Sequence, residues 1–150
     1  MSSGRTVRFP TIGVNHGHIY GQTNLLLNAG AELVSFYAAE PELAAEYGER
    51  YPQARQARGE AEILEDPSID LVISAGIPVD RAPLGVRVMR HGKDYMTDKP
   101  GFTTLAQLDE VRRVQAETGR IYSIDYSERF ENRATTQALE LVRRGAIGAV

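Results

Sequence analysis

Residues 69–75 of this 150-residue chain read Ile-Asp-Leu-Val-Ile-Ser-Ala, a nearly continuous apolar run that follows the turn signal Asp66-Pro67. Such a run is typical of a strand that is buried on both faces, as in a parallel sheet. Outward from it in both directions, short β-type segments alternate with helix-type segments over most of the chain. This alternation indicates βαβ units around one parallel sheet.

The expected elements follow from hydrophobic periodicity and from the residues that begin and end helices. We expect strands near residues 11–14, 31–38, 69–75, 94–97 and 120–126. We expect helices through residues 25–27 and near residues 41–51, 60–65, 82–91, 104–119 and 132–144. Pro10 lacks a backbone N–H, so we expect it at the start of the first strand. The sequence predicts an α/β fold, a Rossmann-type doubly wound, mostly parallel sheet with helices on both faces.

Composition excludes several classes of protein. The chain has no cysteine, which excludes disulfides, zinc–thiolate sites, iron–sulfur clusters and a cysteine nucleophile. Its formal charge is −3 and it has no basic stripe, so we expect no nucleic-acid partner. No apolar run reaches the ~18 residues of a membrane span, and the N-terminus has no apolar signal core. We therefore expect a cytoplasmic protein with no membrane partner.

The loop after the first strand carries a degenerate phosphate-binding pattern. In the spacing G-x-G-x-x-G, Gly13 fits the first position, while Asn15 and His18 occupy the other two. A helix N-terminus there would attract a pyrophosphate through its backbone N–H groups and its partial positive charge. The alternative is a plain βα turn with two ordinary histidines.

A dinucleotide site also needs an acidic residue at the end of the second strand, to hold the adenosine ribose hydroxyls. The expected position is Ala38, which leaves the choice between NAD and NADP open, with no arginine nearby in sequence to attract a 2′-phosphate. Glu40 could reach back, although an acid there also suits the first turn of a helix. His16 and His18 are potential metal ligands, but no third ligand is near them in sequence, so we expect no metal.

Lys99 lies between Asp98 and Pro100, directly after a short expected strand. The carboxyl ends of the strands face the ligand in a doubly wound sheet. A lysine there can hydrogen-bond a ribose or a substrate oxygen, or stabilise a developing negative charge. The alternative is a solvated surface lysine.

The order of these segments resembles the Gfo/Idh/MocA family. The segment from Gly92 to Pro100 is similar to the family's "GKHVxxEKP", and residues 65–72 are similar to its "DPxVDAV". Residues 126–130 resemble its "RF" segment, and residues 145–148 resemble the "GxIG" that opens its second domain. The resemblance implies NAD or NADP as cofactor and a sugar, polyol or diol as small-molecule substrate. It also implies a Rossmann domain over residues 1–125, with residues 126–150 linking to a second α/β domain that is absent from this sequence.

The resemblance implies that Lys99 is catalytic and touches the nicotinamide ribose and the substrate. Tyr126 and Arg129 would lie on the substrate side, and homo-oligomers would form through the missing second domain. Without that domain, we expect the chain to bind cofactor but not to turn over. The alternative is a non-catalytic nucleotide-binding or sensor module, favoured by Ala38 and the altered loop. The expected cofactor contacts are Gly13, Asn15, His16, Gly17, His18, Ile19, Ala38, Ala75, Gly76, Ile77, Asp98, Lys99 and Pro100.

Overall fold

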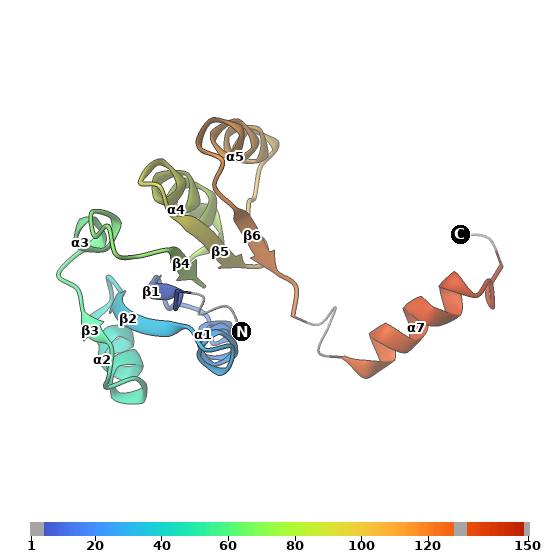
Figure 1. Ribbon diagram of the computed structural model, residues 1–150, viewed down its shortest axis with the longest axis horizontal. Helices are drawn as coiled ribbons and strands as arrows, with labels where there is room; N and C mark the ends of the chain where they lie inside the picture. Colours follow the sequence, from blue (N-terminus) through green and yellow to red (C-terminus); the bar gives the residue numbers. More distant parts are fainter. Residues whose placement is uncertain (1–4, 128–131, 149–150) are drawn as a thin grey trace.

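The sheet of the computed structural model, which describes residues 5–127 and 132–148, has six parallel strands in the order β3-β2-β1-β4-β5-β6 (Figure 1). This order is that of a Rossmann fold, so the predicted architecture is confirmed. The strands are β1 (Arg8–Ile12), β2 (Glu32–Tyr37), β3 (Arg55–Gln56), β4 (Leu71–Ser74), β5 (Asp94–Asp98) and β6 (Tyr122–Asp125).

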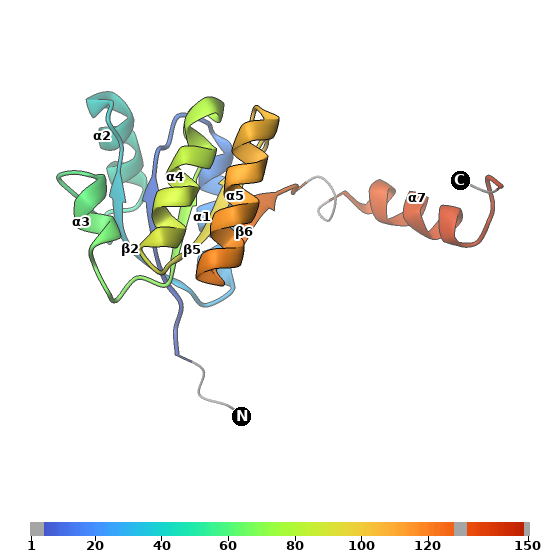
Figure 2. The ribbon, with the colours of Figure 1, turned by 90° about the horizontal axis from the view of Figure 1, so that it is seen from above.

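Helices cover both faces of the sheet, with α1 and α2 on one face and α3, α4 and α5 on the other (Figures 1 and 2). The helices are α1 (His18–Asn28), α2 (Pro41–Arg50), α3 (Glu60–Leu64), α4 (Pro78–Arg90), α5 (Leu105–Thr118) and α7 (Arg133–Arg143). None of these helices is long and apolar enough to cross a membrane.

Alternate residues of the central strand β1 enter the two cores. Phe9 packs with α1 and α2 residues such as Ile19 and Tyr47, while Ile12 packs with residues of the opposite face such as Leu84. The Tyr47 hydroxyl lies 2.8 Å from the Thr11 hydroxyl, within the first core. Burial on both faces explains why the inner strands read as continuous apolar runs.

The first strand corrects the prediction for Pro10. β1 runs from Arg8 to Ile12, so Pro10 lies at its centre and not at its start. The pairing of β1 with β2 shifts register between Phe9 and Pro10. The irregularity falls at the residue that has no N–H to give to the ladder, which explains how a proline is tolerated in a central strand.

Helix α7 extends away from the sheet (Figures 1 and 2). It confirms the predicted helix near residues 132–144, and Asn132 caps it by accepting a hydrogen bond from the Ala134 N–H at 2.9 Å. None of its residues is buried. The expectation that this region begins a second domain stays a prediction.

Candidate functional site

The loops that follow β1 and β4 meet where the strand order reverses, since β1 lies between β2 and β4. Ligands of open α/β sheets bind in the crevice at this switch point. A pocket of about 290 Å³ lies there, which we call the switch-point pocket. Its lining residues come from the ends of β1, β2 and β4 and from α3 and α4: Ile12, Gly13, Asn15, Tyr37, Ala39, Glu40, Glu60, Ser74, Gly76, Ile77, Asp80, Arg81, Pro83, Leu84 and Arg87.

Gly13 is required by the backbone of the first loop. Its φ is +77°, in the left-handed region, and a Cβ there would lie 3.1 Å from the Cα of Gly76. The Gly13 N–H donates to the Tyr37 carbonyl at 2.9 Å, and the Gly13 carbonyl accepts from the Ala75 N–H at 3.1 Å. The loop is thus fastened to the ends of β2 and β4, and it forms one wall of the pocket.

The acidic group at the end of β2 is Glu40. It precedes α2 as the N-cap residue but makes no side-chain capping bond, and its Oε1 instead accepts a hydrogen bond from Asn15 Nδ2 at 2.8 Å. The carboxylate therefore lines the switch-point pocket. Ala38, the position expected from sequence, is buried in the core beside α1 and α2 and is not among the lining residues. Its neighbours Tyr37 and Ala39 do line the pocket, and the expectation that Ala38 contacts the cofactor stays a prediction.

An arginine does reach this pocket, although none is near the end of β2 in sequence. Arg87 of α4 donates to both carboxylate oxygens of Glu60, at 2.6 and 3.0 Å. Hydrogen bonding to Glu60 is the main cause that raises the pKa of Arg87 above its ordinary value. Its guanidinium is thus already engaged with a carboxylate.

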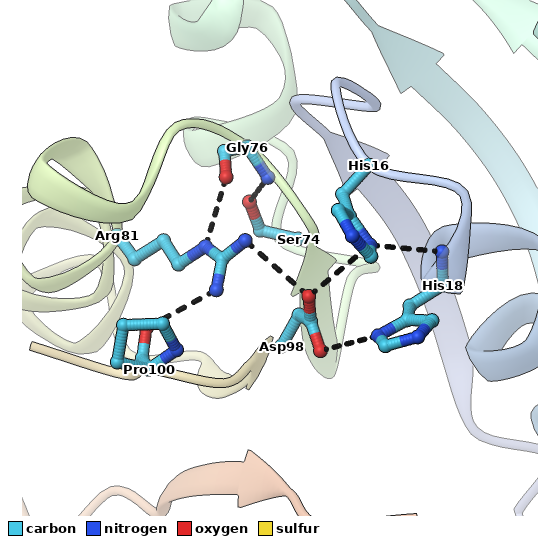
Figure 3. Close-up of polar contacts among 7 residues, drawn as sticks. All are labelled: His16, His18, Ser74, Gly76, Arg81, Asp98 and Pro100. Atoms are coloured by element: carbon cyan, nitrogen blue, oxygen red, sulfur yellow. Dashed lines mark hydrogen bonds and ion pairs between the residues drawn. The ribbon is translucent and has the colours of Figure 1, made fainter.

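Two histidines of the first loop converge on the end of β5 (Figure 3). His18 Nδ1 lies 3.0 Å from Asp98 Oδ1, and His16 Nδ1 lies 3.5 Å from Asp98 Oδ2. The Asp98 carboxylate is buried, while both imidazoles are about half exposed. From sequence, these histidines were expected only as part of the phosphate-binding loop. The structure instead joins that loop to the residue that precedes Lys99.

Arg81 holds the buried carboxylate from the other side (Figure 3). Its side chain is 2% exposed, and its Nη2 lies 3.3 Å from Asp98 Oδ2. Its remaining nitrogens donate to the carbonyls of Gly76 and Pro100, at 2.8 and 3.2 Å. One guanidinium therefore ties α4 to the ends of β4 and β5 and fixes the orientation of Asp98.

Lys99 follows β5 directly and is partly buried. The Lys99–Pro100 peptide bond is cis. Lys99 thus lies at the carboxyl edge of the sheet, as the sequence predicts, and it follows Asp98, the residue that contacts the two histidines. Its catalytic role stays a prediction.

A second pocket, of about 300 Å³, lies between α1 and the end of β6, and we call it the β6 pocket. Since His18 lines it and Arg81 lines the switch-point pocket, Asp98 connects the two pockets through its contacts with both residues. Tyr126 follows β6 and is 54% exposed, while Arg129 lies outside the described residues. The β6 pocket is lined by Gly17, His18, Gly21, Gln22, Leu25, Asp125 and Ser127.

The other expected contacts divide into two groups. Gly76 and Ile77 line the switch-point pocket, and Gly17 is the N-cap residue of α1. Ile19 and Ala75, however, are fully buried in the core. Ala75 reaches the loop only through its backbone, where its carbonyl accepts from the His16 N–H at 3.0 Å. Their side chains therefore support the site without facing the pocket.

Arg81 was not assigned to the site from sequence, and Glu40 was considered only as an alternative to a helix-start acid. Glu40 stands directly before Pro41, a position that suits a helix start and conceals a pocket residue. Arg81 lies in a helix where a charged residue is ordinarily solvated. No local signal distinguishes a buried arginine there, because its three partners come from other segments.

A parallel sheet in this order, with a glycine-dependent first loop and a pocket at the switch point, defines the chain as a nucleotide-binding Rossmann domain. Comparison with protein families gives a specific match: residues 7–126 match the model of an oxidoreductase family with an NAD-binding Rossmann fold. The chain belongs to this family, the Gfo/Idh/MocA oxidoreductases. No curated protein matches the sequence.

Solved structures share the fold. A proposed oxidoreductase from Erwinia carotovora atroseptica is 41% identical with a TM-score of 0.88, over 93% of this chain and 42% of that one. Myo-inositol 2-dehydrogenase from Lactobacillus plantarum is 16% identical with a TM-score of 0.84, over 97% of this chain and 43% of that one, which shows the fold alone. The chain thus spans about two fifths of the length of the solved structures that it matches.

Proposed function

We propose that this chain is the cofactor-binding part of an NAD(P)-dependent dehydrogenase or reductase that acts on a CH–OH group of a sugar, polyol or diol. The observation that carries the proposal is the junction at Asp98. It lies between the switch-point pocket and the β6 pocket, with Lys99 next to it in sequence at the end of β5. A hydride-transferring site needs this arrangement, because cofactor and substrate must meet end to end.

The residues present fit a dinucleotide. Only glycine leaves the backbone of the first loop open at Gly13, where a side chain would strike Gly76. The α1 N-terminus has no acidic residue in its first turn to repel a pyrophosphate. Glu40 supplies the acceptor for a ribose diol. Because a carboxylate there repels a 2′-phosphate and Arg87 is engaged by Glu60, we expect a preference for NAD(H) over NADP(H).

When bound, the nicotinamide would accept or supply the hydride. The protein's own task is to position the substrate oxygen and to stabilise the charge on it. Lys99, fixed at the end of β5 beside a buried and triply contacted Asp98, would donate a hydrogen bond to that oxygen.

The β6 pocket suits a hydroxyl-rich substrate. His18, Gln22, Asp125 and Ser127 give it hydrogen-bonding side chains beside two glycines that leave room. Tyr126 follows β6 at the same edge and would extend this polar wall on the substrate side. A sugar or polyol satisfies such a lining better than an apolar substrate does, since buried polar groups need partners.

The direct test is calorimetric titration of the chain with NADH and with NADPH. We expect binding of one dinucleotide per chain, tighter for NADH. The complete protein is then assayed for nicotinamide absorbance against a panel of sugars, polyols and diols. Absence of dinucleotide binding refutes the proposal, and binding without turnover of any CH–OH substrate by the complete protein favours a non-catalytic sensor.

A further inference from the structure

The histidines and Asp98 form a convergent set of ligand atoms drawn from two distant segments (Figure 3). One donor atom from each of His16, His18 and Asp98 lies within 4.8 Å of the others. The sequence interpretation dismissed a metal because no third ligand is near the histidines in sequence. The third ligand comes from β5, 80 residues away from His18. We propose that His16, His18 and Asp98 bind a divalent transition-metal ion, with Zn²⁺ as the expected occupant.

The spacing of the donor atoms fits such an ion. Zinc binds imidazole nitrogen and carboxylate oxygen at about 2.0–2.2 Å, so ligand atoms at the corners of a tetrahedron are separated by about 3.3–3.6 Å. His16 Nδ1 lies 3.5 Å from Asp98 Oδ2, within this range, while His18 Nδ1 lies 3.0 Å from the other oxygen, Oδ1, and would move slightly apart from it around an ion. The longer of these two separations exceeds the usual length of an N–H···O bond to a carboxylate.

A second observation at His16 is not explained by a hydrogen bond to Asp98. The backbone N–H of His18 donates to His16 Nδ1 at 3.3 Å, so this nitrogen acts there as an acceptor. The same nitrogen faces Asp98 Oδ2, which is also an acceptor. Two acceptors that face each other repel unless a cation lies between them. A metal ion that takes the Nδ1 lone pair in place of the His18 N–H would relieve the repulsion, as would a proton on the imidazole.

The ligand set is of the catalytic kind. Catalytic zinc sites use three protein ligands, among them two histidines and a carboxylate, and keep a further position open. Here the further position can be reached from solvent, because His16 is 53% and His18 44% exposed. His18 also lines the β6 pocket, which gives access from that side. Arg81 provides the outer support, because ligating carboxylates are themselves held by hydrogen bonds.

The charges around the site define what the ion would hold. The buried Arg81 and Asp98 cancel each other, and the α1 N-terminus adds partial positive charge, so a bound dication leaves the site net positive. Such a site favours an anionic oxygen as the additional ligand. On the proposed function, that oxygen is the one on the carbon that gives or receives the hydride, and the cation would act as a Lewis acid toward it.

The test uses the chain itself, freed of metal with a chelator, and needs no substrate. Zn²⁺ binding is measured by calorimetry, and Co²⁺ is used as a spectroscopic probe of tetrahedral nitrogen and oxygen coordination. We expect one ion per chain, and H16A and H18A should each weaken binding about tenfold or more. H91A is the matched control, because His91 lies at the end of α4 and its Nδ1 contacts the Arg87 carbonyl.

The outcomes are distinct. Stoichiometric binding that H16A and H18A weaken, and H91A does not, supports the site. No binding at millimolar metal, or binding that only H91A weakens, overturns it, and the histidines are then hydrogen-bonding groups that orient or protonate substrate. The test relies on the half-exposed histidines because a substitution of the buried Asp98 could disturb folding. Metal binding without NADH binding would refute the proposed function and leave this inference standing.

Discussion

Glu40→Gln tests the assignment of the ribose-binding acid. The amide keeps the shape of the side chain, and its oxygen can still accept from Asn15, so the loop should stay in place. A hydrogen bond to a charged group contributes about 1.5–3 kcal/mol and a neutral one about 0.5–1.5 kcal/mol. The difference of about 1–1.5 kcal/mol predicts an approximately five- to fifteenfold weaker affinity for NADH.

The same substitution should strengthen NADPH binding, because it removes the negative charge that faces the 2′-phosphate. Calorimetry with both cofactors gives the Kd for NADPH divided by the Kd for NADH. We expect this ratio to fall by about tenfold or more in the variant. Glu42→Gln, an exposed acid in the first turn of the same helix, is the control and should leave the ratio unchanged. If Glu40→Gln leaves the ratio at its original value in a folded protein, Glu40 does not contact the ribose.

Three further predictions address catalysis, stability and pH. In the complete protein, Lys99→Ala should lower kcat/KM by about tenfold to a thousandfold, or about 1.4–4 kcal/mol. An unchanged kcat/KM would show that Lys99 has no catalytic role. Arg81→Met removes one partner of a buried ion pair and should lower the free energy of unfolding by about 3–5 kcal/mol, measured with urea, against less than 1 kcal/mol expected for an exposed arginine. Burial raises the pKa of both Tyr47 and Tyr95 to about 12, from 10.0, so the stability that their neutral forms contribute below pH 10 should be lost as the pH rises to about 12. Tyr47→Phe should remove the Tyr47 share of that loss, measured with urea along the pH series, and a decline as steep as that of the unchanged protein would disprove the assignment.

The fold could be predicted because its signals are local. Apolar runs, prolines at helix starts and glycines after helix ends act within a few residues, and they placed the sheet and its helices. Strand bounds were less well predicted where tertiary contacts decide them. β3 has only two residues, Arg55 and Gln56, both exposed, and no pattern marks it. Pro10 was placed wrongly because a register shift, invisible in sequence, accommodates it.

The loops and strand ends that form the candidate site could be predicted from sequence, but several of its side-chain contacts could not. The position of Gly13 in the pocket wall and of Lys99 at the carboxyl edge of the sheet could be predicted because strand ends and the family motif mark them. The hydrogen bonds of Arg81 and the contact of His18 with Asp98 join residues that are far apart in sequence, so sequence spacing does not predict them. Ala38 was expected at the ribose because the position was counted from the end of the second strand, whereas the structure buries Ala38 in the core and places Glu40 in the lining of the switch-point pocket.

The contacts at Asp98 also have a consequence for synthesis of the chain. His18 and Asp98 are 80 residues apart, and Arg81 and Asp98 are 17 apart. On the ribosome, the first loop is made long before the strand that completes the site. Since contacts between distant segments must overcome the entropy of closing a long loop, the first loop must wait for β5 to emerge. Until residue 98 has been made, the histidine loop and Arg81 lack the carboxylate that joins them.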